Sequence, residues 1–174
     1  KRYDAGGSHT SRSIDEIDTR ISEIRGDDYA KEVFGVVAGV ISEEWTLVVE
    51  PNGYLTTQAF RLSELSKGTE VLSVFWNVNA LSEFAFFRDG KNQALLNDIL
   101  FFTPDDDGSS PSSTLENVEG EKTEEVKQLV YELSKAEPYE WNEPVLAWIA
   151  EYTKTEIPTG WLNQRHLSTI IEET

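Results

Sequence analysis

Carboxylates gather in one segment of the chain and raise the question of calcium binding. A Ca²⁺ loop of the EF-hand type needs oxygen ligands at fixed spacings around a central glycine and a bidentate glutamate at its end. With Gly108 in the place of that glycine, Asp105 and Asp107 fall at ligand positions, but Thr103 and Thr114 occupy the first and last positions. Two required carboxylates are therefore missing. The spacing favours a solvated acidic run over a dedicated metal site.

Side chains that could act as nucleophiles or hold cofactors are scarce. The chain has no cysteine and 2 histidines, which excludes thiolate catalysis, disulfides and Cys-based zinc or iron–sulfur sites. His166 and Ser168 could join a carboxylate in a triad, but no Gly-x-Ser-x-Gly turn presents a nucleophile. The glycine-rich loops of the common nucleotide-binding motifs are also missing. We predict no catalytic residue, no metal and no cofactor.

Residues 70–80 alternate between two kinds of side chain, which predicts a strand with one apolar and one polar face. The apolar face, which we expect to join the core, consists of Leu72, Val74, Trp76 and Val78. The polar face consists of Ser73, Phe75, Asn77 and Asn79. The turn before it adds three further candidate binding residues: Glu50, Asn52 and Tyr54.

Two interpretations of this polar face stay open. Amides on a half-buried sheet often hydrogen-bond to the backbone of neighbouring loops, which is a structural role. Alternatively, adjustable hydrogen-bonding groups around an exposed aromatic ring are typical of the centre of a protein interface.

The charge balance limits the class of partner. The 174 residues include 32 acidic and 15 basic side chains, a formal net charge of -17, so nucleic-acid phosphates would be repelled. We expect an acidic protein-binding module, immunity-like or regulatory, that associates non-catalytically with a basic protein partner. Two alternatives are a DNA-mimic inhibitor and an enzyme of unknown chemistry with a pocket near Glu50, Asn77 and Asn79.

The elements that position these residues begin with a helix over residues 13–25. Ser13 and Glu16 have the spacing of a capping box, and isoleucines recur at intervals of three and four. Residues 33–41 and 45–50 then predict a hairpin. Gly35 and Gly39 share one face of its first strand, so we expect a large group to pack closely there.

The rest of the chain continues this pattern. Asp89 and Gly90 predict a tight turn between a strand at 82–88 and one ending near Phe102. Residues 104–122 predict a mobile acidic loop. Further helices are expected at 57–67, 123–136 and 142–153. The tryptophans that we expect to be largely buried are Trp45, Trp76, Trp148 and Trp161.

Together these elements predict an α+β fold. We expect an antiparallel meander sheet of about five strands between Val33 and Phe102, with helices packed mainly on one face. Residues 1–12 would be a flexible tail and residues 13–174 a single domain. No stretch approaches the roughly 18 to 20 apolar residues of a membrane span, and no signal-peptide pattern opens the chain. We expect a cytoplasmic protein, with a removed signal peptide left open because the chain does not begin with Met.

Three motifs give the chain a family resemblance: VEPNG at 49–53, LS-x-GT at 65–69 and WNVNA at 76–80. With these the sequence resembles an uncharacterised actinobacterial domain-of-unknown-function family over about residues 40–160. The C-terminal part of this region is similar too: a helix and then the run at 155–158, with the matching helix residues Ala147, Ala150, Glu151 and Thr153. Residues 97–102 and the N-terminal helix depart from the family's pattern. The resemblance implies a small cytoplasmic single-domain α+β protein of the kind that includes immunity and partner-binding modules.

Overall fold

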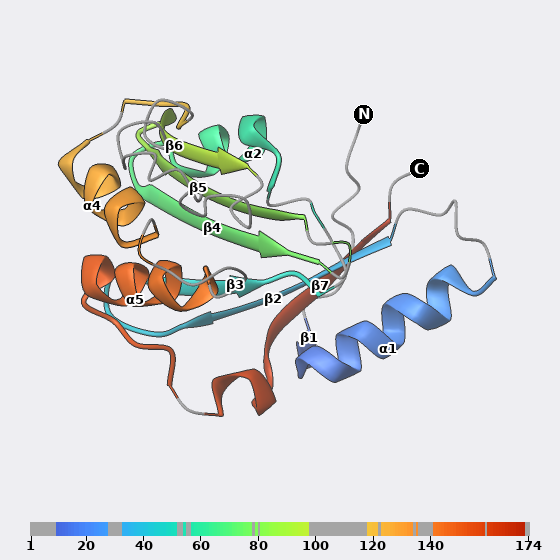
Figure 1. Ribbon diagram of the computed structural model, residues 1–174. Helices are drawn as coiled ribbons and strands as arrows, with labels where there is room; N and C mark the ends of the chain where they lie inside the picture. Colours follow the sequence, from blue (N-terminus) through green and yellow to red (C-terminus); the bar gives the residue numbers. More distant parts are fainter. Residues whose placement is uncertain are drawn as a thin grey trace. The chain divides into compact units, whose positions relative to one another are not determined.

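The computed structural model describes residues 10–27, 33–51, 54, 57–77, 79, 81–97, 118–121, 123–133, 135, 141–158 and 160–172. In these residues the chain forms seven strands, four α-helices and one 3-10 helix (Figure 1). It divides into two compact units, residues 1–55 with 155–174 and residues 56–154. Each unit has its own antiparallel sheet, which confirms the α+β class.

The strands are distributed over two sheets, whereas the sequence predicts one sheet between Val33 and Phe102. The first sheet has the order β1-β7-β2-β3 and the second the order β4-β5-β6. Alternation along a strand does not show which neighbour the strand will pair with, so the C-terminal partner of β2 is invisible in the sequence pattern. The single domain over residues 13–174 stays a prediction.

The first unit combines the two ends of the chain. Its elements are β1 (Thr10–Arg12), α1 (Ile14–Arg25), β2 (Val33–Val40), β3 (Thr46–Val49), the 3-10 helix η3 (Trp161–Asn163) and β7 (His166–Glu172). The predicted helix and hairpin are confirmed. Residues 10–12, which the sequence assigns to a flexible tail, instead pair with β7, and the rest of that tail lies outside the described residues.

Two glycines on β2 allow close packing, as the sequence predicts. A Cβ atom on Gly35 would lie 2.3 Å from Ile17 Cγ2, so α1 can rest directly on the strand. A Cβ atom on Gly39 would lie 2.7 Å from His166 Nδ1 and 3.0 Å from Trp161 Cζ2. The core of this unit therefore forms against a strand surface that has no side chain at two positions.

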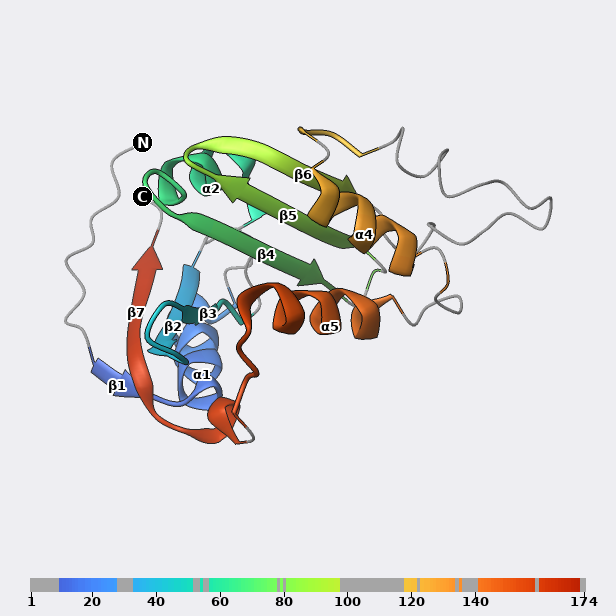
Figure 2. The same ribbon diagram turned by 90° about the vertical axis from the view of Figure 1, so that its left-hand side faces the viewer.

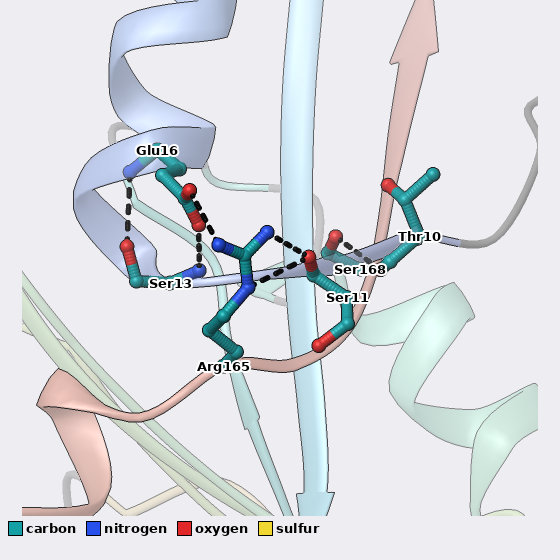
Figure 3. A network of polar contacts seen from close by, with 6 residues as sticks. All are labelled: Thr10, Ser11, Ser13, Glu16, Arg165 and Ser168. Carbon is teal, nitrogen blue, oxygen red and sulfur yellow. Dashed lines mark hydrogen bonds and ion pairs between the residues drawn. The ribbon is translucent and has the colours of Figure 1, made fainter.

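A polar network ties β1, the start of α1 and β7 together (Figure 3). Ser13 and Glu16 form the predicted capping box, with the Ser13 amide donating to Glu16 Oε2 at 2.8 Å. Arg165 donates to the other Glu16 oxygen at 2.9 Å and to the Ser11 carbonyl at 2.7 Å. Ser168 Oγ donates to the Thr10 carbonyl at 2.7 Å. These bonds attach β1 to β7 and to the start of α1.

The second unit is built around a meander. Its elements are α2 (Ala59–Leu65), β4 (Glu70–Trp76), β5 (Ser82–Arg88), β6 (Lys91–Asn97), α4 (Glu124–Leu133) and α5 (Asn142–Thr153). The predicted turn joins β5 and β6, with positive φ at both Asp89 (50°) and Gly90 (77°), as a two-residue hairpin turn requires. The helix predicted at 142–153 has those bounds, and the helices predicted at 57–67 and 123–136 are present but shorter.

The two faces of this sheet are covered differently. Helices α4 and α5 lie side by side on one face and enclose the larger core (Figure 2). The other face carries a small cluster in which Leu62 of α2 packs on Ala85 and Phe87. Helices therefore pack on both faces, with the larger contribution on one.

The tryptophans follow the prediction in part. Trp148 and Trp161 are buried and Trp45 is half-buried, but the burial predicted for Trp76 is wrong, because 58% of that residue is exposed. Trp76 is the last residue of β4, and β4 is an edge strand, so no strand shields it on that side. The buried Trp141, just before α5, closes this part of the core instead.

The acidic segment is described only at its end. Residues 98–117, which include every position of the calcium spacing considered above, lie outside the described residues. Val118 is buried in the larger core, and the Glu119 and Leu95 backbones exchange two hydrogen bonds, so the predicted loop ends by residue 118. In the described part of the chain, no helix has both the length and the apolar character needed to cross a membrane.

Candidate functional site

The predicted binding residues fall into both units. Ser73 and Phe75 lie on β4 and are partly buried, and Asn77 and Asn79 lie in the turn that leads to β5. Glu50 and Tyr54 belong to the first unit, where the Tyr54 ring meets Phe34 edge to face at 5.6 Å. Asn52 lies outside the described residues. The structure therefore groups four of the predicted residues at one end of the β4–β5 hairpin.

Asn77 organises the turn at this end of the hairpin. Its Oδ1 accepts hydrogen bonds from the Asn79 amide at 2.9 Å and the Leu81 amide at 3.2 Å. Its own amide donates to the Leu81 carbonyl at 3.0 Å. An asparagine that satisfies backbone donors in this way stabilises a turn, so the structural interpretation fits Asn77. Asn79 is exposed. Only its backbone amide takes part in these bonds, so they assign its side chain neither the structural role nor the binding role.

Two large apolar side chains flank this turn. Trp76 and Leu81 are 58% and 52% exposed, on either side of Asn77 and Asn79. The Trp76 ring is held edge to face against Trp141 with centroids 6.2 Å apart. The exposed aromatic ring that the sequence analysis assigns to Phe75 is thus Trp76. The alternation rule placed Trp76 in the core because it takes no account of the strand's end.

Glu83, which the sequence analysis does not single out, lies on β5 directly opposite Phe75 on β4 and Asn97 on β6. Its Oε1 atom is buried and accepts no hydrogen bond. Burial raises the pKa of this carboxyl group above its ordinary value. The available signal in the sequence was a glutamate inside a predicted strand, directly before the apolar residues 84–87.

A second polar cluster lies on the opposite face of the same sheet. Arg88 donates to Glu70 Oε1 at 2.5 Å and to the Tyr152 hydroxyl at 2.6 Å, and that hydroxyl donates to Glu70 Oε2 at 2.8 Å. Burial, followed by the hydrogen bond to Glu70, raises the pKa of Tyr152, so the phenol stays protonated. All three groups satisfy one another, which fits a clamp between α5 and the sheet.

The residues of the conceivable triad also have structural partners. His166 stacks on Trp161 with ring centroids 3.7 Å apart, and its Nε2 donates a hydrogen bond to the Trp161 carbonyl at 2.7 Å. Ser168 Oγ donates its hydrogen bond to the Thr10 carbonyl. Among the described residues, no group of three His, Cys, Asp or Glu side chains could hold a metal ion. The arrangement around the hairpin suits binding: an apolar pair, an exposed amide and a carboxylate that lacks a donor.

Comparison with known proteins places the chain in a family. No curated protein and no solved structure matches it. A family of unknown function, DUF6461, matches residues 1–157, a longer region than the resemblance read from the three motifs. Because this match covers most of the 174 residues, the chain belongs to the DUF6461 family.

Proposed function

We propose that this protein is an acidic binding module that associates, without catalysis, with a basic protein partner. One observation carries the proposal. Seven basic side chains of the described residues form ion pairs with acidic side chains of the chain itself, for example Arg20 with Glu23 and Lys154 with Glu151. With a formal net charge of -17, the chain carries an excess of negative charge that its own cations do not neutralise.

The end of the β4–β5 hairpin supplies the short-range contacts in this proposal. Trp76 and Leu81 offer exposed apolar area, and tryptophan is enriched among residues that dominate binding energy. Asn79 adds an exposed amide beside them. Trp76 is already held by Trp141, so binding would order few additional side chains. We therefore place the docking centre at this end of the hairpin.

The experiment is capture of the partner from native cells, followed by kinetics with the purified partner. The association rate should fall roughly tenfold between about 0.05 M and 0.5 M NaCl, while the dissociation rate changes much less. Trp76→Ala and Asn79→Ala should speed dissociation and leave association unchanged, because contacts of short range act after encounter. Leu146→Ala, an exposed leucine on α5, is the matched control for loss of apolar surface.

Three results would oppose the proposal. The purified partner could be acidic, its association could be independent of salt, or Leu146→Ala could accelerate dissociation as much as Trp76→Ala. A partner that normally binds DNA would favour the DNA-mimic form of the same proposal. Asn77→Ala is a poor probe of binding, because the loss of its backbone bonds would change the turn itself.

A further inference from the structure

We infer that the sheet surface formed by Phe75, Glu83 and Asn97 is a binding site for a cationic side chain, lysine or arginine, presented by the protein partner. This inference rests on the proposed function and names the group that the partner would insert. The three residues come from three adjacent strands, since Glu83 pairs with Phe75 on one side and with Asn97 on the other. Directly paired residues have Cβ atoms about 4.5 to 5.5 Å apart, so one group could contact all three.

The first argument is the missing donor. A buried carboxylate oxygen without a hydrogen bond destabilises the folded protein, and such atoms are rare in folded chains. Glu83 Oε1 is one of them in the described part of this chain. Glu83 as a whole is only partly buried, so a donor from outside the chain can approach its exposed side, and rotation of the carboxyl group would then bring the unsatisfied oxygen to it. A cation is the donor that an ionised carboxylate binds most strongly.

The second argument is that the described residues do not supply this donor to Glu83 Oε1. Among the ion pairs formed by the described residues, Arg88 with Glu70 lies on this sheet itself, and Lys67 with Glu64 lies at the end of α2. Both cations are therefore already bound to other carboxylates. Burial is the cause of the raised pKa at Glu83, with no basic side chain opposing it.

The third argument is the chemistry of the neighbours. An aromatic face attracts a cation within about 6 Å of the ring centre, and the effect grows as water is removed. Asn97 is exposed and offers an amide oxygen as a second acceptor. Carboxylate, aromatic ring and amide together select a guanidinium or ammonium group over an anion or a neutral amide. Phe75 immediately precedes Trp76 and Glu83 follows Leu81 by two residues, so this site lies at the same end of the hairpin as the proposed docking centre, on the face of the sheet opposite Trp76.

The test is a titration of the isolated protein with butylguanidinium chloride, monitored by backbone amide NMR shifts. We expect saturable shifts at Phe75, Glu83 and Asn97, with a dissociation constant of about 1 to 30 mM, as befits a ligand of few atoms. Sodium butyrate, which has a chain of similar length and the opposite charge, and sodium chloride at matched ionic strength should produce no saturable shift there.

Two variants sharpen the test. Glu83→Gln should weaken butylguanidinium binding by at least about fivefold, because the charged acceptor is lost. Glu121→Gln removes the same charge from an exposed position and should leave binding unchanged. Phe75→Leu keeps an apolar residue but removes the aromatic ring, and should weaken binding by a smaller factor.

Absence of saturation in the wild-type protein, or equal weakening by Glu83→Gln and Glu121→Gln, would overturn the inference. The comparison of butylguanidinium with butyrate uses the wild-type protein alone. It therefore tests the inference even if Glu83→Gln folds poorly. Failure of the titration would leave salt-dependent association through Trp76 intact. Failure to find a basic partner would refute the proposed function even if butylguanidinium binds.

Discussion

The two faces of the β4–β5–β6 sheet differ in how completely their groups are satisfied. On the face under α4 and α5, Phe84 and Phe86 are fully buried against Trp148, and the indole of Trp148 donates to the Glu125 carbonyl at 3.0 Å. On the face under α2, the acceptor atoms Glu83 Oε1 and Asn92 Oδ1 are buried without a partner. The first face is therefore arranged for stability, while the second retains unsatisfied acceptors next to a small apolar cluster.

This difference separates residues that maintain the fold from residues available for recognition. Sites that bind a partner often retain groups that are unfavourable in the free protein, because the partner satisfies them. Substitutions on the first face should therefore destabilise the protein, whereas some on the second face should not.

The largest expected effect is at Phe84. Its side chain is fully buried, so Phe84→Ala should lower the free energy of unfolding by about 3 to 5 kcal/mol through lost burial and a residual cavity. Phe75→Ala on the opposite face, where the ring is only partly buried, should cost below about 2 kcal/mol. Urea denaturation of both variants measures the contrast. Equal losses would show that the two faces contribute alike.

A smaller loss is expected at Tyr152. Tyr152→Phe keeps the ring stacked on Trp148 at 5.0 Å but removes the hydroxyl that joins Arg88 to Glu70. We expect a decrease of about 1 to 2 kcal/mol in the free energy of unfolding. Tyr131→Phe, at an exposed tyrosine of α4 whose ring contacts Lys135, is the comparison for loss of a hydroxyl group at the surface. A neutral Tyr152→Phe would mean that the clamp adds nothing to stability.

At the hairpin turn the two asparagines should behave differently. Asn77→Ala removes an acceptor used by two backbone amides and should cost about 1 kcal/mol. Asn79→Ala, at an exposed position, should change stability by less than about 0.5 kcal/mol. Thermal melts of the single variants test this ranking. The reverse order would assign the turn-forming role to Asn79.

The sign of the effect should reverse at Glu83. Glu83→Gln should raise the free energy of unfolding at pH 7 by about 0.5 to 1 kcal/mol, because a half-buried charge without a partner is replaced by a neutral amide. Glu121→Gln should have no effect. Destabilisation by Glu83→Gln, measured by urea denaturation, would mean that the carboxylate contributes to the fold.

The smallest effect is the pH dependence of that gain. The pKa of Glu83 is raised in the folded state, so the folded protein binds this proton more tightly than the unfolded chain, and stability falls as the pH rises. The destabilisation should be absent below the unfolded pKa and complete above the folded pKa. The stability difference between Glu83→Gln and wild type should therefore grow with pH through that interval and stay constant on either side of it. A constant difference would indicate that the carboxyl group has its ordinary pKa.

Local patterns in the sequence determined most of the elements. The capping box at Ser13, the isoleucine spacing of α1 and the Asp89-Gly90 turn each depend on residues within a few positions of one another. Gly35 and Gly39 also indicated that another part of the chain packs closely on this strand, although the sequence did not show which residues do so. Short-range chemistry of this kind is legible in a sequence because the chain itself fixes the distances involved.

Pairing and exposure, in contrast, were decided by the tertiary structure. Strand β7 pairs with both β2 and β1, so these pairings join residues more than 100 positions apart. No local pattern encodes them, and they are the reason that the strands form two sheets and not one. Trp76 is exposed because β4 is an edge strand, and Glu83 matters because its oxygen is buried without a donor. The sequence by itself established residue types, charge and local geometry; only the packing of distant segments decided which of those residues lost water and which were left without a partner.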